Sequence, residues 1–305
     1  PIFYKTVNAK KLWMKIINHA HASAEPGLLF WDTMKKYHNA EYCSPLVSTN
    51  PCAEQPLPDG GCCNLGALNL ERFVDKDGNF DFEDFKECTA TATRFLDNVI
   101  DYNLDRHALE DQKQNAINDR RVGLGILGLG DMFVKMGIKY DSDEALNTIT
   151  EIMKVHRDTA YETSVELSLE KGHFPYFKWS GYSKSNFIKD LPEDLQQRIK
   201  NDGIRNSTLT TVAPTGSGAI VARVTSGIEP IFATSYKRKV KKNDKKDVHH
   251  KDNDPTNNDI MPLLLLHTQC LLPLIKFVWC SLCLHRTVSY ERLFTFIMLG
   301  YRLAK

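Results

Sequence analysis

The spacing of apolar residues predicts several amphipathic helices. Apolar side chains recur every three or four positions in residues 9–22, and the same spacing returns in residues 82–100. A longer helix is expected over residues 143–171, ended by the glycine that follows it. Asp141, with Glu144 three residues later, forms a capping-box-like pair at its start. These segments together predict a helix-rich chain.

Proline and glycine interrupt this pattern in residues 43–70. They exclude a helix there and indicate an extended, well-specified loop. Further along, the β-branched run at residues 209–213 predicts a short buried strand, which leads into the turn Pro214-Thr-Gly-Ser-Gly218 and then into a small-residue helix. Helices that alternate with short strands favour an α/β architecture.

Composition narrows the class of protein. The chain has 305 residues, of which 42% are hydrophobic, so it is long enough for one large or two small globular domains. Its 39 basic residues nearly cancel 38 acidic ones, which argues against a nucleic-acid partner. The start at Pro1 carries no signal peptide and suggests a fragment of a longer protein.

The end of the chain differs in composition from the rest. Residues 237–259 are charged and repetitive, and residues 260–284 are apolar but interrupted by Pro262, Pro273 and Lys276, which argues against a membrane span. Residues 243–305 are therefore expected to be an out-of-frame or disordered tail. Its cysteines at positions 270, 280 and 283 are read as a coincidental resemblance to a zinc or redox pair.

The eight cysteines are too sparse for a disulfide scaffold, which points to a reducing compartment. Cys43 and Cys88 are interpreted as packing residues. No metal-ligand set is expected. The glycines of Gly123-Leu-Gly-Ile-Leu-Gly128 match a dinucleotide fingerprint, but polar residues precede them, so we interpret them as sites of close helix packing.

One short segment combines three chemically useful side chains. Asn50, Cys52 and Glu54 stand at alternate positions, and alternate side chains of an extended backbone point to the same side, about 6.5 Å apart. Pro51 and Pro56 favour extended geometry in the residues before them. A radical carrier or nucleophile is thus predicted between a hydrogen-bonding amide and a general base. Taken alone, the pattern is more typical of a buried cysteine with two polar neighbours.

The turn at residues 214–218 has two readings of its own. Its backbone N–H groups and its hydroxyls suit a phosphate, helped by the start of a helix. A plain turn accounts for the same residues equally well.

Motifs in a fixed order resemble the catalytic subunit of ribonucleotide reductases. The finger loop of that family is matched by Asn50-Pro-Cys-Ala-Glu-Gln-Pro-Leu-Pro and Cys63-Asn-Leu-Gly-Ala-Leu-Asn-Leu. The later matches are Asn118-Asp-Arg-Arg-Val-Gly-Leu-Gly, Gly203-Ile-Arg-Asn-Ser-Thr-Leu, Ala213-Pro-Thr-Gly-Ser and Ser226-Gly-Ile-Glu-Pro-Ile-Phe. The resemblance covers about residues 12–242 and is nearest to the adenosylcobalamin-dependent, class II branch.

The resemblance implies a fold and a set of roles. Residues 1–242 would be part of a ten-stranded α/β barrel, with the finger loop, about residues 43–70, inside it. Cys52 would be the thiyl radical that abstracts the 3′ hydrogen of the ribose, Glu54 would take the proton of the 3′ hydroxyl, and Asn50 would hold the substrate. Cys63, rather than its neighbour Cys62, would be half of the redox pair that reduces the 2′ carbon. The implied substrate-binding residues are Asn50, Pro51, Cys52, Ala53 and Glu54 in the loop, with Pro214, Thr215, Gly216, Ser217 and Gly218 in the phosphate turn.

The implied activity is cytoplasmic reduction of ribonucleotides to 2′-deoxyribonucleotides for DNA synthesis. Its cofactors would be adenosylcobalamin and an external dithiol such as thioredoxin or glutaredoxin. A homodimer would act on ribonucleoside di- or triphosphates, with nucleotide effectors bound outside this segment. A class I large subunit with a metal-radical partner is the alternative enzyme, and a non-catalytic nucleotide-binding remnant is the alternative outside enzymes. The chain alone is expected to be inactive, because half of the barrel and the partner of Cys63 are missing.

Overall fold

The structure is a computed structural model that describes residues 5–231 and residue 233. The expected tail, residues 243–305, lies outside the described residues, and so do Cys270, Cys280 and Cys283. Among the described residues, no helix is both long and apolar enough to cross a membrane.

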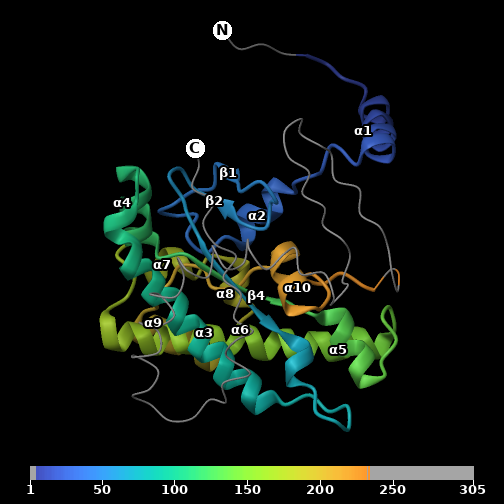
Figure 1. The fold of residues 1–305 in the computed structure, drawn as a ribbon. Coiled ribbons are helices and arrows are strands. Elements are labelled where there is room, and N and C mark those ends of the chain that lie inside the picture. The colour runs from blue at the N-terminus through green and yellow to red at the C-terminus, as the bar shows by residue number, and fades with distance from the viewer. Residues whose placement is uncertain (1–4, 232, 234–305) are drawn as a thin grey trace.

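Helices dominate the described part of the chain (Figure 1). In chain order the elements are α1 (Ala9–Ser23), α2 (Trp31–Tyr37), β1 (Ser48–Thr49), β2 (Pro56–Leu57), β3 (Asn64–Asn69), η1 (Leu70–Phe73), α3 (Phe82–Asn103), η2 (Leu104–Arg106), α4 (Glu110–Asp119), β4 (Val122–Leu127), α5 (Leu129–Met136), α6 (Asp143–Lys171), α7 (Trp179–Tyr182), α8 (Asn186–Lys189), α9 (Glu193–Asp202) and α10 (Gly216–Ala222).

Parallel pairing of β3 with β4 forms the centre of the fold. The two strands pair along their whole length, from Asn64 opposite Val122 to Asn69 opposite Leu127. Residues 208–211 run beside β4, and the N–H of Leu124 donates to the carbonyl of Leu209 over 2.7 Å. The α/β class is therefore confirmed. The ten-stranded barrel is not seen: the described strands form two two-stranded sheets, neither of which is closed.

The strand predicted over residues 209–213 is only partly correct. This segment makes a single parallel bridge, between Thr210 and Leu124. Leu209 is fully buried, but Val212 is 47% exposed. The chain leaves β4 after Thr211, so the last residues before Pro214 have no strand to pair with in the described part of the chain.

The three predicted long helices are confirmed. α3 packs against both strands of the β3–β4 pair and, on another side, against α6 (Figure 1). The start of α6 differs from the prediction: the hydroxyl of Ser142, and not Asp141, caps the helix by accepting the N–H of Ala145 over 3.1 Å. Asp141 instead adopts a left-handed conformation with φ of 67°, which turns the chain into the helix.

Helix α1 stands apart from the other elements (Figure 1). None of its residues is buried by the described part of the chain. Its apolar face is displayed instead, with Leu12, Trp13, Met14 and Ile17 each between 40% and 51% exposed. The predicted amphipathic helix is thus present, but the surface that would cover its apolar face is not among the described residues.

A histidine lies inside the apolar core between α3 and α6. His156 is fully buried and stacks on Phe85 with a centroid distance of 6.0 Å. Neither ring nitrogen has a hydrogen-bond partner in the described structure. Burial lowers the pKa of His156 from 6.5 to about 4, because the charged ring cannot be solvated there. The folded chain therefore keeps this ring neutral where an unfolded chain would protonate it.

This histidine makes the protein acid-sensitive. Between pH 6.5 and about 4 only the unfolded state binds the proton, so the free energy of unfolding falls as the pH falls through this window. The slope from this one group reaches about 1.4 kcal/mol per pH unit. We expect His156→Leu to flatten the dependence and to raise the melting temperature at neutral pH, where it removes unpaired polar atoms from the core. Thermal melts at several pH values test this, and a slope equal to that of the unmodified chain would contradict it. His19→Leu, at an exposed site on α1, is the control.

Candidate active site

The Asn50–Glu54 segment forms the turn of a hairpin. Strands β1 and β2 pair antiparallel, with Ser48 opposite Leu57, and we call residues 48–57 the radical-loop hairpin, after the role that the family resemblance implies for Cys52. The N–H of Asn50 donates to the carbonyl of Gln55 over 3.1 Å, and the N–H of Gln55 donates back to Asn50 Oδ1 over 3.0 Å. Ala53 has a φ of 64°. The prediction of an extended backbone with three side chains on one side is therefore wrong, because these bonds reverse the chain between the two prolines.

The turn nevertheless separates the predicted residues into distinct environments. Cys52 is exposed at its tip, as are Pro51 and Ala53. Asn50 is half-buried, and its side-chain oxygen closes the turn, while its amide nitrogen has no acceptor among the described residues. Glu54 is also half-buried, and its Oε2 is covered without a hydrogen-bond partner in the described structure. An exposed thiol thus lies two residues from a covered carboxylate oxygen that has no hydrogen-bond partner in the described structure.

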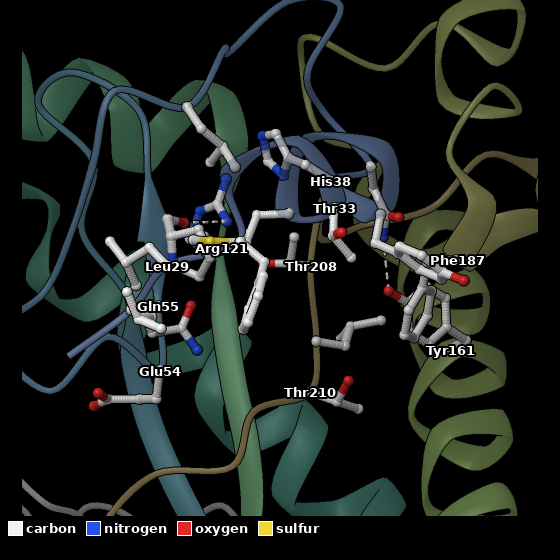
Figure 2. Close-up of a pocket in the computed structure, with 18 residues that line it drawn as sticks. Leu29, Thr33, His38, Glu54, Gln55, Arg121, Tyr161, Phe187, Thr208 and Thr210 are labelled. Carbon is white, nitrogen blue, oxygen red and sulfur yellow. Dashed lines mark hydrogen bonds between the residues drawn. The ribbon is translucent and has the colours of Figure 1, made fainter. Parts of the chain in front are cut away.

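Glu54 borders a cavity of about 500 Å³ (Figure 2). Figure 2 shows Arg121, Gln55 and Glu54 along one wall, with Tyr161 and Phe187 at the opposite side. The cavity lining is largely apolar and is completed by Leu28, Leu29, Phe30, Thr33, Met34, Tyr37, His38, Asn39, Leu46, Pro56, Thr208, Leu209 and Thr210. Burial, with the nearby charge of Arg121, lowers the pKa of His38 to about 4 and keeps its ring neutral.

The neighbouring cysteines Cys62 and Cys63 lie just before β3. Both are half-buried free thiols. Burial raises the pKa of the Cys63 thiol, and the positive charge of Arg121 opposes that shift. Burial also raises the pKa of Cys62. In the described structure Cys63 is therefore a protonated thiol at neutral pH, which is the form that can give up a hydrogen atom.

The turn at residues 214–218 leads into a helix, as predicted, but the segment before it is strand-like only as far as Thr211. α10 begins at Gly216, so the N–H groups of its first turn have no partner within the helix. Pro214, Gly216 and Ser217 are exposed. Thr215 differs from this pattern: it is 1% exposed, and its hydroxyl accepts the N–H of Gly227 over 2.9 Å. The hydroxyl of Thr215 therefore holds the 226–227 segment in place, and the backbone N–H groups of the first turn of α10 are left without a partner within the helix.

The glycines that match a dinucleotide fingerprint have another role. Gly123 and Gly125 lie within β4, not in the turn after a strand that the fingerprint requires. The sequence suggested that they allow close packing of a helix, but among the described residues their nearest neighbours lie outside helices. A Cβ at Gly123 would lie 2.6 Å from Nε2 of Gln55, and one at Gly125 would lie 2.8 Å from the carbonyl oxygen of Thr211. The radical-loop hairpin and the 208–211 segment therefore pack directly against the backbone of this strand.

Two residues at this junction were missed by sequence reasoning. Arg121 donates to the carbonyl of Pro56 over 3.3 Å, and Thr211 donates through its hydroxyl to the carbonyl of Glu54 over 3.2 Å. Both lie in or beside matched family motifs, but backbone carbonyls carry no sequence signal. Only the fold reveals which side chains reach them.

Comparison with known proteins places this sequence in a family. The sequence model of the ribonucleotide reductase barrel domain matches residues 2–258, which is well over half of the chain. The chain belongs to the ribonucleotide reductase family. The recognition made from its motifs is confirmed.

Named relatives include both cobalamin-dependent and other reductases of the family. The chain is 39% identical over 236 residues to the vitamin B12-dependent ribonucleoside-diphosphate reductase of Thermoplasma acidophilum, which covers 77% of this chain and 28% of the relative. The enzyme of the same name from Mycobacterium tuberculosis is 36% identical over 232 residues, covering 76% and 31% respectively. The ribonucleoside-diphosphate reductase large chain of Encephalitozoon cuniculi is 31% identical over 247 residues, covering 76% and 32%. The chain thus spans less than a third of the length of these relatives.

Proposed function

We propose that this chain is the radical-loop segment of a ribonucleotide reductase that converts ribonucleotides to 2′-deoxyribonucleotides. One observation supports this above all. The tip of the radical-loop hairpin presents the exposed thiol of Cys52, and two residues later Glu54 holds a carboxylate oxygen without a partner at the edge of a cavity. A thiol and a base in this relation suit removal of a hydrogen atom and a proton from one sugar carbon and its hydroxyl.

Each site residue then has a chemical role. As a thiyl radical, Cys52 takes the 3′ hydrogen atom of the ribose, and Glu54 accepts the proton of the 3′ hydroxyl. The 2′ hydroxyl leaves as water, and Cys63 with a second thiol supplies the two electrons and becomes a disulfide. Asn50 donates a hydrogen bond from its side-chain amide to the substrate. Cys52 recovers its hydrogen atom at the end, so the thiol is regenerated.

The turn at residues 214–218 is the proposed phosphate site. Unpaired backbone N–H groups at the start of α10 suit the negative oxygens of a ribonucleoside di- or triphosphate. Thr211 lies three residues before Pro214 and donates to Glu54, which links the turn to the radical-loop hairpin through a short stretch of chain. Pro51 and Ala53 line the sugar from the tip of the hairpin.

The rest of the protein is proposed to complete the site. It would add strands to the β3–β4 layer and close a ten-stranded barrel around the hairpin, which would shield the radical from water. It would also supply the second redox cysteine, the effector sites and the contacts of a homodimer. A thioredoxin- or glutaredoxin-like protein would reduce the disulfide in the cytoplasm, where thiols stay reduced.

Adenosylcobalamin is the proposed source of the radical. The higher identity to relatives named as vitamin B12-dependent favours it over the metal-radical partner of class I enzymes. The described residues fit such a cofactor at one point: the thiol of Cys52 is exposed at the tip of a turn, where a bulky group can approach. When bound, this cofactor supplies radical chemistry. The sulfur of Cys52 holds the hydrogen atom that is removed from the ribose.

A chimera tests the proposal. In the Thermoplasma acidophilum reductase, the matching segment is replaced by that of this chain, and formation of deoxycytidine diphosphate from cytidine diphosphate is measured. We expect product only when adenosylcobalamin and a dithiol are both supplied. A folded chimera that binds cytidine diphosphate but forms no deoxynucleotide would contradict the proposal and favour a nucleotide-binding remnant. The unmodified archaeal enzyme is the positive control.

A further inference from the structure

The radical-loop hairpin contacts the rest of the molecule at three consecutive residues. The carbonyl of Glu54 accepts the hydroxyl of Thr211 over 3.2 Å, and the carbonyl of Pro56 accepts Nη1 of Arg121 over 3.3 Å. Between them, Gln55 is 4% exposed. In Figure 2 a dashed line marks the bond from Arg121, on the same wall of the cavity as Gln55 and Glu54. These contacts begin only two residues after Cys52.

Arg121 is itself held rigidly. Its Nε and Nη2 both donate to Oδ2 of Asp119, over 3.1 and 2.9 Å, and the two side chains are 2% and 1% exposed. The carbonyl of Asp119 in turn accepts the N–H of Ser207 over 3.1 Å. A planar guanidinium that is fixed on one side by a carboxylate presents its remaining N–H in one direction. That direction is toward Pro56.

Thr211 is held by the sheet rather than by a side chain. Its N–H donates to the carbonyl of Leu124 in β4 over 3.1 Å, and the residue is 7% exposed. Both donors to the hairpin therefore come from β4 or from residues directly beside it. The hairpin's own turn is closed by Asn50 and Gln55, and Gln55 also lies against Gly123 of β4, so the two hydrogen bonds add to this contact in setting the orientation of the hairpin.

We propose that Arg121 and Thr211 are positioning residues that fix the radical-loop hairpin against β4, so that Cys52 and Glu54 keep one orientation toward the substrate. The proposal rests on the proposed reductase function. Neither residue touches a reacting atom, and both act through backbone carbonyls of the hairpin. Displacement of a reacting group by about 1 Å lowers turnover on the order of 100-fold, so a loosened hairpin reduces kcat even though both reactive side chains are present.

Kinetics of the chimera test the proposal. We expect Arg121→Gln to lower kcat on the order of 100-fold and Thr211→Val on the order of 10-fold, with KM for cytidine diphosphate nearly unchanged. Arg121→Lys keeps the charge, but its single nitrogen cannot bond Asp119 twice and also reach Pro56, so it should recover only part of the loss. Thr211→Val keeps the shape of the side chain and removes only the hydroxyl.

Matched controls separate positioning from stability. Arg120, the neighbour of Arg121, is 5% exposed and bonds to Asp97 and Asp101 instead of the hairpin. Arg120→Gln should therefore destabilise the fold but leave kcat of the folded fraction unchanged. Thr163 is a buried threonine whose hydroxyl bonds within α6 to the carbonyl of Thr159. Thr163→Val should leave kcat unchanged.

Hydrogen exchange in the 305-residue chain gives a second measurement that needs no activity. Arg121→Gln and Thr211→Val should speed exchange of the Asn50 and Gln55 amides, and Arg120→Gln and Thr163→Val should not. Wild-type kcat together with wild-type exchange in Thr211→Val and in any folded Arg121 variant overturns the positioning role. Activity that persists in Cys52→Ser overturns the proposed function instead, so the two failures are distinguishable.

Discussion

Cys52→Ser is expected to reduce ribonucleotide turnover by the chimera to the level of a sample without protein. A hydroxyl holds its hydrogen much more strongly than a thiol does, so serine cannot become the radical that attacks the sugar. The substitution changes one exposed atom at the tip of a turn, whose closing bonds are made by Asn50 and Gln55. Nucleotide binding and the melting temperature should therefore stay close to those of the unmodified chimera.

Cys43→Ser is the matched control for this loss. Cys43 is a half-buried free thiol that bonds to the carbonyl of Ala40, and burial raises its pKa to about 11. Its replacement should leave turnover intact. Assays of deoxycytidine diphosphate formation, alongside titration with cytidine diphosphate, distinguish chemistry from binding. Product formation by Cys52→Ser would remove the thiyl mechanism from consideration.

Asp97→Ala is expected to lower the free energy of unfolding by about 3–5 kcal/mol, because it leaves the buried guanidinium of Arg120 with only the partly exposed Asp101 as an acidic partner. Asp97 is fully buried in α3 and accepts Arg120 over 2.7 Å, Asn206 over 3.0 Å, Lys171 over 3.2 Å and Arg205 over 3.4 Å. Burial alone would raise the pKa of Asp97, but Arg120, Arg205 and Lys171 outweigh it and lower the pKa. This carboxylate thus joins α3, α6 and the loops before β4 and after α9.

A surface ion pair provides the comparison. Glu170 accepts Arg94 over 2.6 Å, but the two side chains are 49% and 40% exposed. Exposed pairs contribute less than about 1 kcal/mol, so Glu170→Ala should cost little. Urea denaturation of both variants, followed by circular dichroism, measures the difference. Equal losses in the free energy of unfolding would show that the Asp97 cluster stabilises the fold no more than an exposed ion pair does.

The long helices were predictable because each carries its signal locally. The apolar spacing of α6 continues over many turns, and Gly172 ends it in the expected place. The start was misjudged because Ser142 and Asp141 are both good capping residues, and only the backbone conformation decides between them. The start of α6 therefore depends on the backbone conformation of Asp141 and Ser142, which apolar periodicity does not report.

The geometry of the candidate site was not predictable from the sequence. Family motifs pointed to Asn50, Cys52, Glu54 and Cys63, whose roles stay predictions, and the backbone from Asn50 to Glu54 was expected to be extended. The side-chain oxygen of Asn50 competes with that extended form by bonding to the N–H of Gln55. Strand β4 was misread for a related reason, since its glycines mark contact with segments far away in the sequence.

The bare backbone of β4 has a consequence for how this protein can change. Alanine at Gly123 or Gly125 would add a single methyl group in the space now filled by Gln55 and by the carbonyl of Thr211. Such a methyl would displace the hairpin and the 208–211 segment, which we propose orient Cys52, without altering any of the proposed site residues. The proposed orientation of the Cys52 sulfur therefore depends partly on the absence of side chains at two positions of a neighbouring strand. A comparison of catalytic side chains alone would not reveal this dependence.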